Sequence, residues 1–168
     1  ARGEAGNETL SSFSYRLFAK RFLTDTIDLT DGFLARVVPP IMSQIPELQD
    51  QGSLLKNFLL INGRLRQTNA RELIALAQRT SPRFLWRQPF VPLTNAKVEA
   101  SFAERRTYLY KGQVVDHQDH VGFDLAVTEH IPVAAANDGI VVHAGFFGIY
   151  GNTVVIDHGC GLQTLNGH

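Results

Sequence analysis

The chain has 168 residues, of which 44% are hydrophobic and 19% charged, so it can bury the core of one good-sized domain or of two small ones. Lysine plus arginine equals aspartate plus glutamate, at 16 each, so no global charge attracts nucleic acid or an anionic membrane. The single cysteine, Cys160, excludes an intramolecular disulfide and the cysteine-rich zinc patterns. Its place between two glycines favours a turn residue over a thiolate nucleophile.

Membrane and targeting segments are not expected in this chain. No apolar run approaches the roughly 20 residues that span a bilayer, and the first residues lack the apolar stretch of a signal peptide. We therefore expect no transmembrane segment and no nucleic-acid partner. The abrupt end at His168, without a polar tail, is what a chain cut within a domain would show.

Residues 1–80 are expected to form an accessory region, with a strand followed by helices. Partial alternation from Phe13 to Phe18 predicts the strand. Asp31 is placed to cap a short helix, which Pro39 and Pro40 should end because proline lacks the N–H group.

The most helical stretch runs from Ser53 to Arg79. Its apolar residues recur three and four apart, and Ser53 is a suitable N-cap. Gly63 weakens the middle by about 1 kcal/mol relative to alanine. Either one helix or two helices that meet near Gly63 would fit, and the apolar face predicts core packing without visible chemistry.

Residues 81–96 are expected to form a strap packed on the following domain. Prolines there prevent regular helix and alternate with aromatic side chains that a free linker would leave exposed: Pro82, Phe84, Trp86, Pro89, Phe90 and Pro92. Stacking of Trp86 on a carbohydrate is the less favoured alternative.

Residues 97–168 alternate short apolar runs with glycine-rich turns, which predicts an antiparallel β-sandwich or open barrel. Lys111-Gly112 and the segment 157–161 are expected turns. Asp138-Gly139 predicts a hairpin between the apolar runs 132–136 and 140–142. The whole chain is thus expected to be an α+β protein, mostly helical at first, with a β-rich domain that is incomplete at its C-terminus.

His120 and Asp124 are the best candidates for chemistry. In an extended segment, residues four apart lie on one face, so both side chains could converge on one ion. Imidazole and carboxylate suit a divalent ion such as zinc. The spacing alone is weak evidence, because a surface pair would look the same.

Several short motifs follow one another over residues 98–168. They are Phe102-Ala103-Glu104-Arg105, His120-Val121-Gly122-Phe123-Asp124, Pro132 to Ala135, Asp138-Gly139, Tyr150-Gly151-Asn152 and Ile156-Asp157-His158-Gly159. In order and spacing this segment resembles the lysostaphin/LytM-type zinc endopeptidases, peptidase family M23, which cut peptide bonds in peptidoglycan. The combination is far more specific than any one motif.

The resemblance implies roles for four residues. His120 and Asp124 correspond to two of the three zinc ligands, and His168 to a histidine beside the zinc that orients or stabilises the reacting species. Arg105 resembles an arginine that lines the site. The family's His-x-His segment, which carries the third ligand, lies further C-terminal, so the printed chain alone is expected to be inactive.

The resemblance also implies Zn²⁺ as cofactor, a peptidoglycan peptide as partner and a location in the periplasm or cell envelope. The N-terminal helices are a candidate contact for a regulatory partner. One alternative is a catalytically degenerate relative that binds peptidoglycan or activates another cell-wall hydrolase. Another is a sugar-phosphotransfer IIA domain, which phosphorylates the histidine of a similar motif but has its segments in the opposite order.

Overall fold

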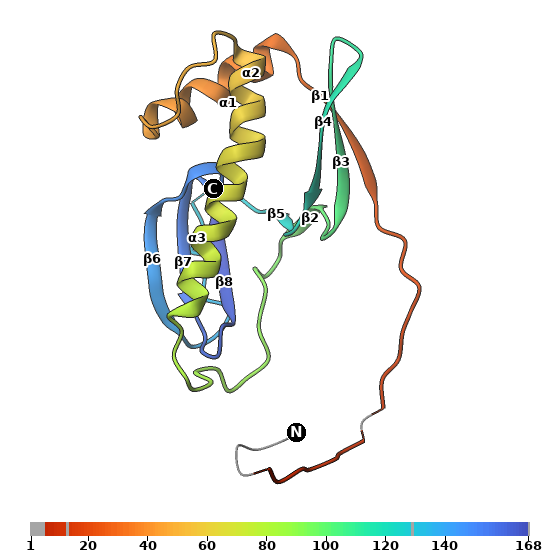
Figure 1. Ribbon diagram of the computed structural model, residues 1–168, viewed down its shortest axis with the longest axis vertical. Helices are drawn as coiled ribbons and strands as arrows, with labels where there is room; N and C mark the ends of the chain where they lie inside the picture. The colour runs from red at the N-terminus through yellow and green to blue at the C-terminus, as the bar shows by residue number, and fades with distance from the viewer. Residues whose placement is uncertain (1–5, 13, 129, 168) are drawn as a thin grey trace.

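The computed structural model describes residues 6–12, 14–128 and 130–167 of an α+β protein, which confirms the expected fold class. Most of the helix comes early in the chain and most of the strands follow (Figure 1). The helical elements are α1 (Asp31–Gln44), α2 (Leu54–Leu60), the π-helical turn η1 (Ile61–Leu65), α3 (Arg66–Gln78) and the 3₁₀ turn η2 (Gly148–Tyr150). The strands are β1 (Thr24–Asp28), β2 (Lys97–Ala100), β3 (Glu104–Tyr110), β4 (Gln113–His120), β5 (Asp124–Ala126), β6 (Ile140–Phe146), β7 (Asn152–Asp157) and β8 (Gln163–Gly167).

The first strand lies later than the sequence indicated. Residues 14–23 have no regular structure, Phe13 lies outside the described residues, and β1 covers residues 24–28 instead. An alternating pattern forms a strand only where an edge is available to pair with it. Here that edge is β3, which β1 joins in parallel, with Thr24 opposite Arg105 and Asp28 opposite Leu109.

Helix α1 continues past the two prolines that were expected to end it. Thr30, and not Asp31, is its N-cap, because the Thr30 hydroxyl accepts a hydrogen bond from Phe33 N (3.1 Å). Pro39 and Pro40 each remove one helical hydrogen bond, but both lie on the exposed face, where water can satisfy the freed carbonyl groups. Tertiary packing of the opposite face therefore outweighs the local signal.

The predicted helical stretch from Ser53 to Arg79 is confirmed as one continuous helix, which runs beside the β3–β4 hairpin and beside the strands β6–β8 (Figure 1). Ser53 caps it by accepting a hydrogen bond from Lys56 N (3.3 Å). Gly63 lies within η1, so the weak point gives a widened π turn and no break.

One hydrophobic core joins the helices to β3. Its buried side chains come from α1, α2, η1, β3 and the residue that follows β1: Leu29, Leu34, Val38, Phe58, Ile61, Leu65 and Tyr108. Phe58 and Tyr108 meet at a ring-centroid distance of 5.6 Å, which attaches the helical region directly to the hairpin that carries His120.

The strands form three small sheets, ordered β1-β3-β4, β2-β5 and β6-β7-β8. All described pairings except that of β1 with β3 are antiparallel. The expected turn at Lys111-Gly112 joins β3 to β4, with φ of +50° and +77° at its two residues. Whether these sheets belong to a sandwich or an open barrel stays a prediction.

The expected hairpin at Asp138-Gly139 is wrong, because residues 132–136 do not form a strand. Val91 N donates to Ala136 O (3.0 Å) and Asn137 Nδ2 donates to Gln88 O (2.6 Å). The segment 132–136 therefore meets residues 81–96, which are irregular along their whole length, while β6 pairs with β7. In the described part of the chain, no helix is sufficiently long and apolar to cross a membrane.

Candidate metal half-site

His120 and Asp124 come together where β4 ends and where β3 and β5 begin. His120 is the last residue of β4 and pairs with Glu104 at the start of β3, while Asp124 begins β5. His120 Nε2 lies 3.4 Å from Asp124 Oδ1. The imidazole is mostly buried, with 16% of its side-chain surface exposed, whereas the carboxylate is half exposed at 53%. The pair thus combines a sheltered nitrogen with an oxygen open to solvent.

His120 Nε2 is a buried polar atom that makes no hydrogen bond with the described residues. An unsatisfied buried polar atom costs free energy, so such an atom in a native fold calls for an explanation such as an ion. Burial lowers the pKa of His120, and the nearby Arg106 guanidinium lowers it further, against the opposing effect of Asp124 and Glu104. The neutral imidazole, which is the metal-binding form, is therefore favoured.

The pair fits zinc in distance as well as in ligand type. Two ligands about 2.0–2.1 Å from a tetrahedral zinc ion are about 3.3–3.4 Å from each other. The separation of 3.4 Å between His120 Nε2 and Asp124 Oδ1 matches this edge of the tetrahedron. Within the described residues no third His, Cys, Asp or Glu joins them, so the geometry is that of a half-site.

An arginine does contact the half-site, but it is Arg106. Its Nη2 donates to Asp124 Oδ2 at 2.8 Å, and its Nε donates to Glu104 Oε2 at 3.2 Å. Arg105, which the family resemblance placed beside the site, is directed to the other face of β3, where its Nε lies 3.6 Å from Asp119 Oδ1. Alternation along a strand separates the two arginines, and the sequence did not tell which face carries the site.

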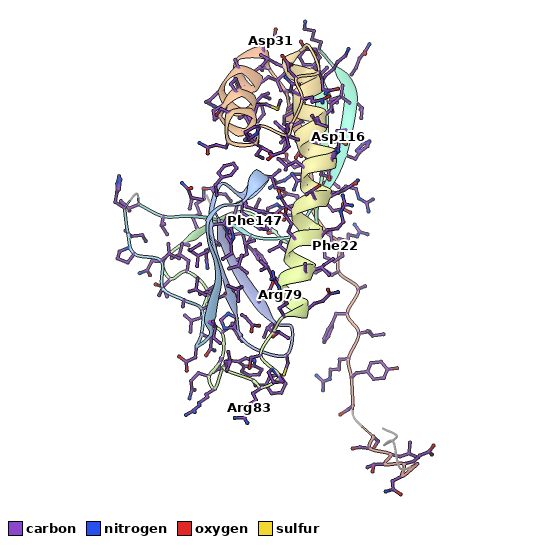
Figure 2. All side chains as sticks on the ribbon, turned by 60° about the vertical axis from the view of Figure 1, so that its left-hand side comes forward. Phe22, Asp31, Arg79, Arg83, Asp116 and Phe147 are labelled. Carbon is purple, nitrogen blue, oxygen red and sulfur yellow. The ribbon has the colours of Figure 1, made fainter. Side chains whose placement is uncertain are left out.

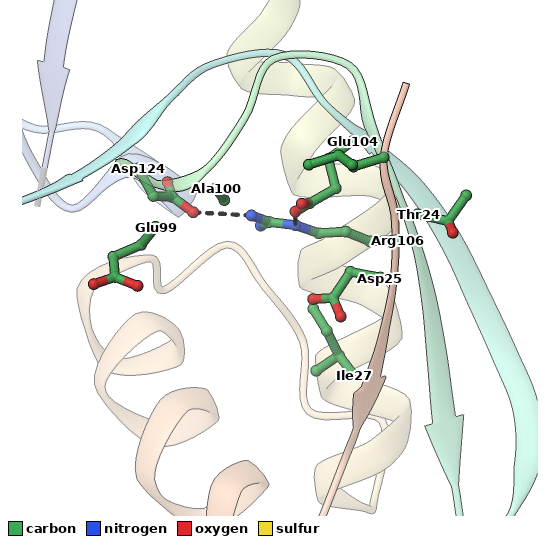
Figure 3. A pocket seen from close by; sticks show the side chains of 9 residues that line it. Thr24, Asp25, Ile27, Glu99, Ala100, Glu104, Arg106 and Asp124 are labelled. Carbon is green, nitrogen blue, oxygen red and sulfur yellow. Dashed lines mark hydrogen bonds and ion pairs between the residues drawn. The ribbon is translucent and has the colours of Figure 1, made fainter. Parts of the chain in front are cut away.

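Two pockets lie on these opposite faces. The one beside Asp124 has a volume of about 480 Å³ and is lined by Leu23, Thr24, Asp25, Ile27, Glu99, Ala100, Glu104, Arg106 and Asp124 (Figure 3). The other, of about 490 Å³, includes Arg105, Asp119 and Val121. Leu23 and Thr24 line both, so the segment that enters β1 separates the two hollows.

Ala103, just before β3, helps to place His120. It has φ of +61°, in the left-handed region that favours glycine. Its N–H donates to His120 O at 2.7 Å, which holds the end of β4 in place.

Three other histidines have different surroundings. His168 lies outside the described residues, so its role beside a metal stays a prediction. His117 lies within β4 on the exposed face, where Nδ1 is 3.2 Å from Thr107 Oγ1. His143 is half-buried against the Phe147 ring.

His158 is a structural residue. It is completely buried, with Nδ1 at 2.7 Å from Asp138 O and Nε2 at 2.9 Å from Thr164 Oγ1. The Phe90 ring packs edge-on against it at a centroid distance of 4.8 Å. Both ring nitrogens are thus satisfied within the fold.

Comparison with known proteins identifies the family of the segment that holds the half-site. Residues 118–168 match the model of peptidase family M23. A 49-residue stretch is 43% identical to proteins named DD-carboxypeptidase/endopeptidase Mpg from Neisseria meningitidis serogroup B and from Neisseria gonorrhoeae. The alignment covers 29% of this chain and 11% of each relative. This C-terminal segment belongs to the M23 peptidases, as its motifs predicted.

Proposed function

We propose that this chain is part of a zinc-dependent endopeptidase that hydrolyses peptide bonds in the stem peptides or cross-links of peptidoglycan. The observation that carries the proposal is the buried His120 Nε2, which has no hydrogen-bond partner among the described residues and lies 3.4 Å from Asp124 Oδ1, inside the segment that matches the M23 family. Family membership supports a peptidase, and the geometry of the pair supports the metal.

The chain's own residues would contribute in distinct ways. His120 and Asp124 would each supply one ligand atom to the ion. A bound zinc ion supplies Lewis-acid activation of the scissile carbonyl and of water. Because Asp124 is half exposed, the open side of the half-site faces solvent, where a peptide could approach. A third ligand and a proton-transfer group are required from outside the described residues. His168 is a candidate to orient or stabilise the reacting species beside the ion.

The decisive experiment digests purified peptidoglycan with the intact gene product, with and without a metal chelator. Release of new amino termini that stops on chelation and returns on adding zinc is expected. Analysis of the released fragments would identify the bond that is cut.

The His120→Ala variant should abolish this release, and His117→Ala, a change on the exposed face of the same strand, should leave it intact. Absence of chelator-sensitive cleavage by the intact protein would favour the alternative of a degenerate relative that binds peptidoglycan or activates another hydrolase.

The proposed peptidoglycan substrate also implies where in the cell the enzyme would act. The enzyme would act in the periplasm or cell envelope, where its substrate is. A regulatory partner would have the exposed face of the α1–α3 region available for contact. Fractionation of cells followed by immunodetection would test the location.

A further inference from the structure

Among the described residues that line the pocket beside Asp124, Arg106 is the only cation, and it lies among carboxylates (Figure 3). It comes from the middle of β3 and is mostly buried, with 19% of its side-chain surface exposed. A charged side chain with so little exposure needs fixed partners, because burying it otherwise costs several kcal/mol. Its two partners are Glu104, which is buried, and Asp124.

The two hydrogen bonds use different nitrogen atoms of the guanidinium group. Nε donates to Glu104 Oε2 at 3.2 Å, and Nη2 donates to Asp124 Oδ2 at 2.8 Å. Glu104 in turn belongs to the residue pair Glu104–His120 in the β3–β4 register. The guanidinium is therefore fixed by the same strand pair that places the imidazole.

Asp124 needs such a fixed partner. The terminal torsion of an aspartate is broad, so a half-exposed carboxylate is not oriented by its own rotamer preference. With Oδ2 engaged by Arg106, the other oxygen, Oδ1, is the one that faces His120 Nε2 at 3.4 Å. One oxygen is thus committed to the protein and one is left for a ligand.

We infer that Arg106 is a positioning residue for the proposed metal site, which fixes the Asp124 carboxylate in the orientation that presents Oδ1 beside His120 Nε2. Glu104 assists by holding the guanidinium and balancing its charge. The inference rests on the proposed function, because it assigns a role toward the metal. The family resemblance implied that Arg105 lines the site, and this inference assigns that position to Arg106 instead.

Positioning and simple electrostatics make opposite predictions about Arg106. By charge alone, removing a cation near a metal site should strengthen binding of a divalent cation. If Arg106 instead orients a ligand, its removal should weaken binding, as the loss of hydrogen-bond partners of metal ligands commonly does, by about 10–100-fold.

The test measures zinc affinity of the intact protein and of its Arg106→Gln variant by competition with a chromophoric chelator. We expect the variant to bind zinc about 10–100-fold more weakly. The visible absorption spectrum of the cobalt-substituted protein should change as well, because it reports the arrangement of ligands around the ion. A purely structural role for Arg106 would lower thermal stability without either change in the folded protein.

Arg105→Gln is the matched control, since it removes the same side chain one residue away on the opposite face of β3. Its zinc affinity should equal that of the wild type. If Arg106→Gln leaves Glu104 unpaired and does not fold, the double variant Glu104→Gln/Arg106→Gln removes both charges and is compared with Glu104→Gln alone. Circular dichroism establishes folding of each variant.

Unchanged or tighter zinc binding by folded Arg106→Gln would overturn the positioning role while leaving the proposed function standing. An equal loss in Arg105→Gln would overturn it too, because the effect would then not depend on the contact with Asp124. Failure of the wild type itself to bind zinc would overturn the proposed function, and this inference with it.

Discussion

Two histidine–aspartate pairs in this protein use the same chemical groups to different ends. In the pair Asp157–His158, both residues are buried and both side chains are held by several hydrogen bonds. In the pair His120–Asp124, the imidazole nitrogen has no hydrogen-bond partner in the described part of the chain and the carboxylate is half exposed. The contrast teaches that satisfaction of polar atoms, and not residue type, separates a structural pair from a candidate ligand pair.

The Asp157–His158 pair joins three segments at one end of the β6-β7-β8 sheet. Asp157 accepts hydrogen bonds from Thr80 Oγ1 (2.6 Å) and Ser81 N (2.9 Å), just after the end of α3. Leu85 N donates to His158 O at 2.9 Å. Figure 2 shows Arg79 near the lower end of the long helix and Arg83 below the sheet, along the segment that leaves the helix. The pair therefore fixes the connection between the helical region and the sheet.

The largest expected effect concerns metal binding by the half-site. His120→Ala should lower zinc affinity by more than the roughly 100-fold that the loss of an outer partner can cost, because the proposed function makes His120 a direct ligand. The free energy of unfolding without metal should change by less than about 1 kcal/mol, since no hydrogen bond to the ring is lost. Zinc titration and urea unfolding measure the two quantities. A large loss of stability with unchanged zinc affinity would reverse the assignment of the two pairs.

The reverse result is expected for His158→Ala. Removing a completely buried ring leaves a cavity and unpaired Asp138 O and Thr164 Oγ1, so the free energy of unfolding should fall by about 3 kcal/mol. Urea unfolding without metal measures this. If the variant were as stable as the wild type, the Asp157–His158 pair would not be the structural pair.

Asp157→Asn should lower stability by about 1–3 kcal/mol at neutral pH, because an amide nitrogen cannot accept from Ser81 N or Thr80 Oγ1. Burial raises the pKa of Asp157, but the hydrogen bonds from Thr80, Ser81 and Gly159 outweigh it, and the net pKa is lowered. The stabilisation by the carboxylate is therefore complete above the unfolded-state pKa of about 3.9 and is lost as the pH falls through the lower folded-state pKa.

Urea unfolding at a series of pH values checks this dependence. The difference in stability between wild type and Asp157→Asn should be constant near neutral pH and shrink at acid pH. A difference that grows on acidification would contradict the lowered pKa.

The smallest expected effect comes from Thr164→Val, which removes the partner of His158 Nε2 with little change in shape. It turns a satisfied buried nitrogen into an unsatisfied one, like that of His120, at a cost of about 1 kcal/mol. Urea unfolding measures the loss, and Thr107→Val, on the exposed face of β3, is the control. Zinc affinity at His120 should not change in either variant.

The sequence predicted local features whose causes are local. The Ser53 cap, the helix that follows it, the turn at Lys111-Gly112 and the family of the C-terminal segment are all confirmed. Each depends on residues close together in the chain or on motifs in a fixed order. The spacing of His120 and Asp124 likewise singled out the two side chains that the fold brings within 3.4 Å.

Tertiary contacts decided the rest. The apolar face of α1 packs in the core, which extends the helix through Pro39 and Pro40 against their local preference. The segment 132–136 bonds to the residues before β2 in place of a neighbouring hairpin strand. These outcomes depend on partners far away in sequence, which local patterns do not specify.

The half-site shows the same division at the level of single side chains. Strand alternation by itself requires Arg105 and Arg106 to point to opposite faces. Only the register of β3 with β4, and the arrival of Asp124 at the start of β5, decides that Arg106 meets the candidate ligand and Arg105 meets Asp119. The sequence therefore determined which residues are candidates to bind a metal, and the tertiary structure decided which neighbours hold them, because those neighbours come from different strands.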